Sequence, residues 1–191
     1  DAIDGVVEHH YFRLTDQYFG DLAAHDQLIG LDYQIWKNNL GENLTLNITE
    51  WNIRTTNYFQ LGMRAASTMI AQFEMLIELD VDEAYVWPPQ HNTSSDLAGP
   101  DEVIFDPLTG IVVNTIGGAI FDLMSSSLVG LENIATSMAG DAANFQDYVY
   151  ASDEKVVIYI ASRTENAEHI NYSLGNNWFG AELTSAIQVG Y

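Results

Sequence analysis

Two kinds of hydrophobic pattern alternate along the first 130 residues of the chain. Residues 4–12 and 44–53 begin with short apolar runs and end in polar and aromatic side chains, which is typical of buried strands that deliver side chains to a site. Residues 61–79 are rich in Ala, Met and Leu, with apolar residues on most faces, and are predicted to form a well-buried helix. Residues 84–87 are predicted to form a third short strand, because the two prolines that follow cannot continue a ladder.

The segments between these elements have weaker patterns. Residues 15–39 carry apolar side chains near helical spacing, which favours one or two helices. Residues 80–83 are predicted to form an acidic turn, residues 90–102 a polar loop and residues 105–113 a hairpin. Residues 115–128 then have the pattern of another helix. This order of strands and helices indicates parallel βα units and an α/β fold.

The hydrophobic pattern of the sequence changes beyond Gly130. Residues 148–150, 156–160 and 169–174 are β-rich runs separated by turn clusters, with no further long helical pattern. We therefore divide the chain into residues 1–130, with βα units, and residues 131–191, a separate antiparallel β module. Three βα units cannot close an eight-fold barrel, which needs about 250 residues, so a barrel interpretation places the missing units before the first residue or on another chain.

Charge excludes some classes of partner. The chain has 6 Lys+Arg and 27 Asp+Glu, which gives a net charge of −21 and a field that repels nucleic-acid phosphates and anionic lipids. No apolar run reaches the length of a membrane span. There is no cysteine, so disulfides, thiol nucleophiles and zinc–thiolate sites are excluded. Such acidity fits a protein that stays soluble in saline surroundings, one that meets divalent cations, or an ordinary acidic enzyme.

The segment ITEWN carries the first candidate for chemistry, since Glu50 stands at the end of a predicted buried strand, where parallel barrels place catalytic groups. The alternative is an ion-paired or solvated strand-end carboxylate. His9, His10 and Tyr11 end the preceding strand and could bind a sugar hydroxyl or orient a carboxylate. Because adjacent strand residues face opposite sides, a metal site built from both histidines is disfavoured, and one buried plus one surface histidine is the alternative.

Aromatic residues offer a second type of site. Trp87 ends the third strand and has the flat apolar surface on which sugar rings pack, and Tyr85 and Trp51 could extend this platform. The alternative is that these residues are core or rim aromatics. No Gly-rich phosphate loop, GxSxG or HExxH motif occurs, and the acidic turn lacks the length and glycine of a calcium-binding hand. We therefore predict no metal site and no cofactor; calcium is left open as a ligand, although no motif supports it.

The segments VVEHHYF, NITEWNI and AYVWP resemble the last three barrel units of retaining glycosidases related to α-L-arabinofuranosidases and β-xylosidases. The segment that begins YASDEKVVIYIAS resembles the accessory β-sandwich that follows the barrel in that family. The resemblance implies a C-terminal part of a TIM barrel with Glu50 as the catalytic nucleophile on the seventh strand. It also implies a sugar subsite lined by His10 and Tyr11, with His9 matching less well, and walled by Trp87.

The implied mechanism is double displacement on a plant- or algal-type polysaccharide, with a second carboxylic acid about 5 Å from the nucleophile. In the family that acid belongs to an Asn-Glu pair at the end of the fourth strand, and no such pair ends a strand here; Glu8 follows no Asn. The chain is therefore expected to need the N-terminal half of the same protein, or a companion chain. We expect a secreted or cell-surface bacterial protein from a saline setting. The alternative is a non-catalytic carbohydrate-binding, surface or filament protein with the same fold.

Overall fold

The computed structural model describes residues 4–12, 43–53, 63–87, 101–137 and 145–162, together with a few isolated positions (35, 38, 39, 89, 182 and 184–187) and excluding residue 88. The helices expected in residues 15–39, apart from three positions, and the strand expected in residues 169–174 lie outside these ranges. The described part is a mixed α/β structure, as the sequence predicts.

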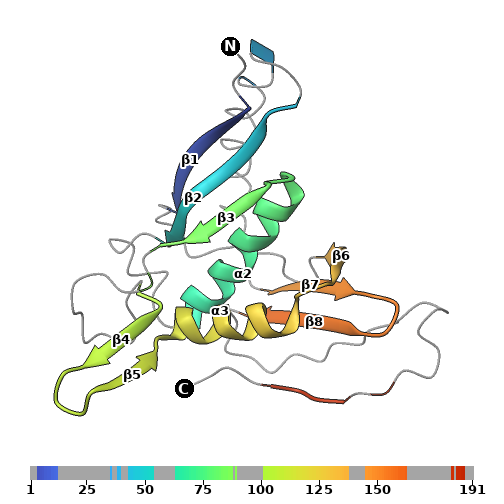
Figure 1. Ribbon diagram of the computed structural model, residues 1–191. Helices are drawn as coiled ribbons and strands as arrows, with labels where there is room; N and C mark the ends of the chain where they lie inside the picture. The colour runs from blue at the N-terminus through green and yellow to red at the C-terminus, as the bar shows by residue number, and fades with distance from the viewer. Residues whose placement is uncertain are drawn as a thin grey trace.

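Three parallel strands form the first sheet, in the order β1 (Gly5–Phe12), β2 (Thr45–Ile53) and β3 (Glu83–Val86) (Figure 1). Helix α2 (Met63–Glu78) connects β2 to β3 and packs on one face of the sheet. These strands and this helix confirm the predicted βα order. No closed barrel is present among the described residues.

An extra residue interrupts strand β2. Leu46 and Ile48 are fully buried on the face that meets the helices, as the apolar alternation requires. The pairing with β1 then skips Thr49, which forms a β-bulge. Beyond the bulge the alternation is shifted by one residue, so Trp51 returns to the helix-covered face and Glu50 lies on the opposite one.

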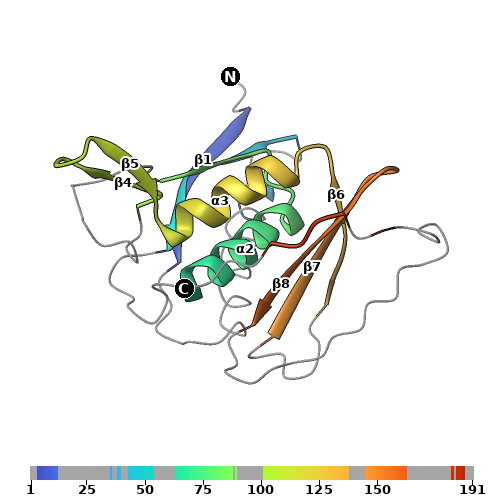
Figure 2. The same ribbon diagram turned by 90° about the horizontal axis from the view of Figure 1, so that it is seen from below.

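Two helices form the middle layer of the molecule. Helix α3 (Ile116–Ser127) begins after the N-cap residue Thr115, whose hydroxyl accepts a hydrogen bond of 3.0 Å from the Gly118 N–H. It lies beside α2, with the parallel sheet on one side and the second three-stranded sheet on the other (Figure 2). One hydrophobic core joins these layers and includes Leu46, Ile48, Trp51, Met69, Met75, Ile120, Met124, Tyr148, Tyr150 and Tyr159.

A hairpin precedes α3 and confirms the turn predicted there. Strands β4 (Val103–Asp106) and β5 (Ile111–Asn114) pair antiparallel, and Gly110 adopts the positive φ of 71° that the turn requires. The hairpin projects away from the helices (Figure 1). All of β5 is exposed.

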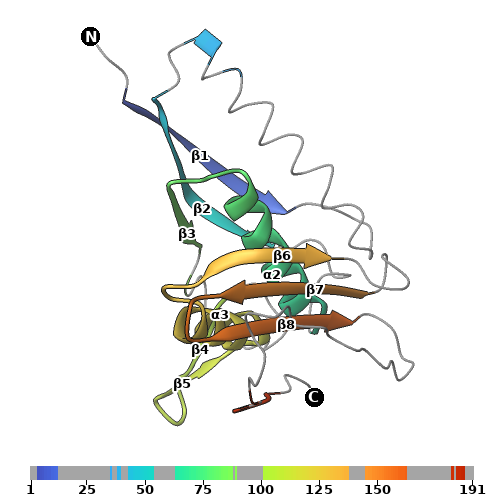
Figure 3. The same ribbon diagram turned by 90° about the vertical axis from the view of Figure 1, so that its right-hand side faces the viewer.

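The second sheet is antiparallel, with the strand order β6 (Glu132–Ser137), β7 (Phe145–Ala151) and β8 (Val156–Ser162) (Figure 3). Strands β7 and β8 confirm the predictions for residues 148–150 and 156–160. The prediction missed β6, because its sequence, ENIATS, has only one large apolar residue and no clear alternation.

Polar contacts fix the second sheet to the helices. Glu74 of α2 is 3% exposed and accepts hydrogen bonds from the Asn133 side-chain amide and the Tyr150 hydroxyl. At the end of α3, the Ser127 hydroxyl lies 2.6 Å from that of Tyr159. These contacts, of which the bond from Tyr150 is buried and the others are partly buried, accompany the apolar core across the same interface. Within the described ranges, neither helix combines the length and apolar character needed to cross a bilayer.

Candidate functional site

The pairing register assigns the strand residues to two faces of the parallel sheet. Paired residues of parallel neighbours point to the same face, and successive residues alternate between faces. The face away from the helices, called here the open face, carries Val7, His9, Tyr11, Asn47, Glu50, Asn52, Glu83 and Tyr85. Val7 is 62% exposed there. A side chain on this face is therefore within reach of a ligand wherever it is not covered locally.

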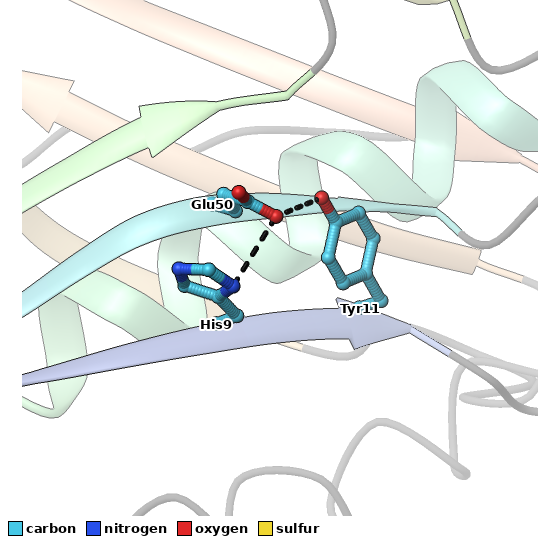
Figure 4. Close-up of polar contacts among 3 residues, drawn as sticks. All are labelled: His9, Tyr11 and Glu50. Carbon is cyan, nitrogen blue, oxygen red and sulfur yellow. Dashed lines mark hydrogen bonds and ion pairs between the residues drawn. The ribbon is translucent and has the colours of Figure 1, made fainter.

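Glu50 is the centre of a polar cluster on the open face. The Tyr11 hydroxyl donates a hydrogen bond of 2.7 Å to Glu50 Oε2, and His9 Nδ1 lies 3.3 Å from the same oxygen (Figure 4). The side chains of His9 and Glu50 are 53% and 30% exposed. The cluster follows directly from register, because His9 pairs with Glu50 and Tyr11 stands two residues further along β1.

This arrangement has two chemical uses. Because both contacts are made to Oε2, Glu50 is held in one orientation while part of its surface meets solvent, which suits a nucleophile or a ligand-binding carboxylate. With its Nδ1 turned toward the carboxylate, His9 has its second ring nitrogen available as an acceptor in the neutral form. The same geometry is therefore compatible with proton transfer by an oriented histidine.

Two of the predicted site residues lie on the other face. Trp51 is 1% exposed and packs against Phe121 of α3, with ring centroids 6.4 Å apart. It is a core aromatic, which corrects its proposed place in a sugar platform. His10 pairs with Trp51 in the ladder, and its carbonyl accepts a hydrogen bond from Gln72 of α2. Strand alternation therefore brings His9 to Glu50, although the resemblance to the glycosidase family matches His10 better.

The other two aromatic candidates are accessible. Tyr85 is 54% exposed on the open face, and Trp87, which follows β3 directly, is 45% exposed. The Tyr85 hydroxyl donates to Glu83, and this hydrogen bond to a carboxylate raises the pKa of Tyr85. The backbone N–H of Trp87 donates a hydrogen bond to the backbone carbonyl of Trp51, which holds Trp87 against the sheet. Both rings keep a surface on which a flat apolar ligand could pack.

Sequence reasoning missed one titratable group near this face. Glu102, within the expected polar loop, is 5% exposed and accepts a hydrogen bond of 3.0 Å from the Asn52 amide. Burial raises the pKa of Glu102 to about 7; the Asn52 hydrogen bond opposes this shift and the charge of Asp101 adds to it. Nothing in the local sequence distinguishes this glutamate from a solvated loop residue.

No group of three or more His, Asp or Glu side chains in the described ranges has a geometry that could hold a metal ion.

Comparison of the chain with protein-family models, with curated proteins and with solved structures gave no match. The geometry of the open face and the motifs that form it are therefore the basis for a functional assignment.

Proposed function

We propose that the chain is the C-terminal part of a secreted retaining glycoside hydrolase of the barrel type, with Glu50 as its nucleophile. The observation that carries this proposal is the position of Glu50, near the C-terminal end of a strand in a parallel sheet, on the open face, with Tyr11 and His9 on one of its oxygens. Carbohydrate is the proposed ligand class.

The surroundings of Glu50 support the proposal. Tyr85 on the open face and Trp87 directly after β3 are exposed aromatics that can pack against a sugar ring. Parallel sheets are ordinarily covered on both faces, and none of the described helices covers the open face. The N-terminal half of a barrel would enclose that face and leave the strand ends accessible.

The proposed reaction has two steps. Glu50 Oε1 attacks the anomeric carbon as the bond from that carbon to the leaving-group oxygen breaks, and a carboxylic acid protonates this oxygen. The product is a glycosyl ester of Glu50. The resulting carboxylate then takes a proton from water, whose oxygen attacks the anomeric carbon and releases Glu50. Tyr11 and His9 would stabilise the carboxylate in the ground state and keep Oε1 directed at the sugar.

The acid/base residue is proposed to come from the N-terminal half or from a companion chain. The first experiment is therefore an intact-mass measurement of the native protein, with peptide sequencing of any segment before Asp1. We expect an Asn-Glu strand end in that segment. A native protein that begins at Asp1 and has no bound companion would exclude the enzyme and favour the second candidate below.

Chemical trapping tests the nucleophile in the full-length protein. A 2-deoxy-2-fluoro glycoside with a good leaving group should accumulate as an ester on the peptide that contains Glu50. Glu50→Gln should lower kcat by about 10³-fold or more, whereas Glu154→Gln, at an exposed glutamate in the turn between β7 and β8, should have little effect. Label on a different residue, or a Glu50→Gln variant with normal turnover, would exclude Glu50.

The second candidate is a non-catalytic carbohydrate-binding protein. It is favoured by the accessible pair Tyr85 and Trp87. In that case, isothermal titration with polysaccharides should detect binding that Trp87→Ala weakens, while no product forms over long incubation.

A further inference from the structure

A second carboxyl group is built into the structure next to the candidate site. Glu102 precedes β4 and is almost fully buried. One oxygen accepts the Asn52 amide N–H, and the other has no hydrogen-bond partner in the part of the chain that the structure describes. A buried carboxyl with an unsatisfied oxygen destabilises the fold, so its position calls for an explanation beyond packing.

The backbone around Glu102 is fixed on both sides. Its carbonyl accepts hydrogen bonds from the backbone N–H and the hydroxyl of Thr115, the N-cap of α3. Gly118 in the first turn of α3 approaches so closely that a Cβ atom there would collide with the Glu102 backbone. A Cβ atom on Gly117 would lie 3.2 Å from Glu102 Oε2. Two glycines thus give the helix start the room to hold Glu102 in one place.

The contact partner of Glu102 is a neighbour of the Glu50 cluster in the strand ladder. Asn52 lies two residues after Glu50 on the same face of β2, and its partner in the ladder is Tyr11. Side chains of paired residues on one face are close neighbours. Asn52 therefore stands beside the tyrosine that donates to Glu50, and it is 1% exposed, so its role is structural support and not ligand contact.

We propose that Glu102 is a positioning residue for the Glu50 cluster. Through its hydrogen bond with Asn52, Glu102 holds the end of β2 after the bulge, so that Tyr11 and Glu50 stay hydrogen-bonded. As a statement about catalysis this inference rests on the proposed glycosidase function. As a statement about geometry it stands by itself. Misplacing a reacting group by about 1 Å can cost about 100-fold in rate, so a firm anchor here has a chemical consequence.

The test compares two substitutions that differ in one property. Glu102→Gln keeps an oxygen that can accept the Asn52 N–H, whereas Glu102→Met has a similar length and no such acceptor. Glu154→Met, at an exposed glutamate in the turn between β7 and β8, is the matched control. The readout is the phenolic ¹³Cζ resonance of Tyr11 in the full-length protein, assigned with Tyr11→Phe and calibrated with Glu50→Gln, which removes the carboxylate.

We expect Glu102→Met to move the Tyr11 resonance toward its position in Glu50→Gln, and to lower kcat by about 10- to 100-fold with little change in KM. Glu102→Gln and Glu154→Met should resemble the wild type in both measurements. A folded Glu102→Met protein with an unchanged Tyr11 resonance would overturn the inference, as would a Gln variant as impaired as the Met variant. If Glu102→Met does not fold, Asn52→Ser removes the other partner and is judged by the same two results.

The two proposals can fail separately. A wild-type protein without hydrolytic activity, whose Tyr11 resonance still responds to Glu102→Met, would refute the glycosidase and retain the positioning role. An active protein in which neither Glu102→Met nor Asn52→Ser changes the resonance would retain the glycosidase and refute the positioning role.

Discussion

Glu50 and Glu74 have similar hydrogen-bond partners in opposite settings. Each carboxylate accepts a hydrogen bond from a tyrosine hydroxyl, Tyr11 for Glu50 and Tyr150 for Glu74. Each also contacts a side-chain nitrogen from a strand, which is His9 Nδ1 for Glu50 and the Asn133 amide for Glu74. Glu74 is 3% exposed between α2 and the antiparallel sheet, whereas the side chain of Glu50 is 30% exposed on the open face. The donors alone therefore do not reveal whether a carboxylate serves structure or chemistry. Access to solvent distinguishes the two.

The same substitution at both positions should separate the two roles most clearly. Glu74→Leu leaves the buried Tyr150 hydroxyl and the partly buried Asn133 amide without their acceptor, so we expect a loss of about 3–5 kcal/mol in the free energy of unfolding. Glu50→Leu should cost less than about 1 kcal/mol, because its partners can bind water. Urea unfolding followed by circular dichroism measures both. Equal losses would contradict the distinction by burial.

Glu102 adds a buried carboxyl whose ionisation should be visible in the pH dependence of stability. Its pKa of about 7 in the folded state is above the ordinary value of 4.5, so the folded state holds this proton more tightly than the unfolded state. The contribution of this proton to the free energy of unfolding is complete below pH 4.5 and is lost as the pH rises through 7. The total loss is about 3 kcal/mol.

Glu102→Gln should abolish that decline, since the amide resembles the protonated acid and cannot ionise. Urea unfolding between pH 4.5 and 8 measures the effect, with Glu154→Gln as a control for the general repulsion within a chain of net charge −21. A Gln variant that loses stability over this range as steeply as the wild type would show that other groups cause the decline.

Removing the tyrosine hydroxyl from each site should give a smaller difference in stability loss between the Glu74 and Glu50 sites, in the same direction. Tyr150→Phe takes a donor from buried Glu74 and should cost about 1–3 kcal/mol. Tyr11→Phe takes a donor from a partly exposed carboxylate and should change stability by less than about 0.5 kcal/mol, while kcat falls by about tenfold or more if Glu50 is the nucleophile. Thermal unfolding and steady-state kinetics on the two variants provide the comparison.

The smallest effect is expected at the exposed edge of the interface that Glu74 stabilises. Lys155 Nζ donates a hydrogen bond of 2.6 Å to the Ser127 carbonyl at the end of α3, and the lysine is exposed. Lys155→Ala should therefore cost less than about 0.5 kcal/mol. A loss comparable with that of Glu74→Leu would indicate that charge at the rim, and not the buried carboxylate, holds the second sheet on the helices.

Much of the scaffold could be predicted because its signals are local. The alternation that ends at Ile48 predicts a strand, the Ala- and Met-rich stretch predicts a buried helix, and Gly110 marks a turn. The position of Glu50 near a strand end follows from the same pattern. Each of these features depends on residues within a few positions of each other.

The remaining features depend on contacts between distant parts of the chain. The burial of Glu102 results from packing against the start of α3 and from Asn52, which is 50 residues away in sequence. Glu74 belongs to a helix pattern that indicates a buried face, yet its partner Tyr150 is 76 residues further on. The choice between His9 and His10 required the register of β1 against β2, which neither strand specifies alone.

The bulge at Thr49 changes which residues of strand β2 face the helices. Up to Ile48 the even positions face the helices, and after the bulge the odd positions do so, as Trp51 shows. If the strand kept Thr49 but ran without the bulge, Thr49 would pair with His9, and regular alternation would direct the indole to the open face and the carboxylate into the core. Removal of Thr49 itself would leave His9 paired with Glu50 and both side chains on their present faces, because the residue removed is the one that the pairing skips. A single-residue gap at position 49 in a related sequence is therefore compatible with the same open face.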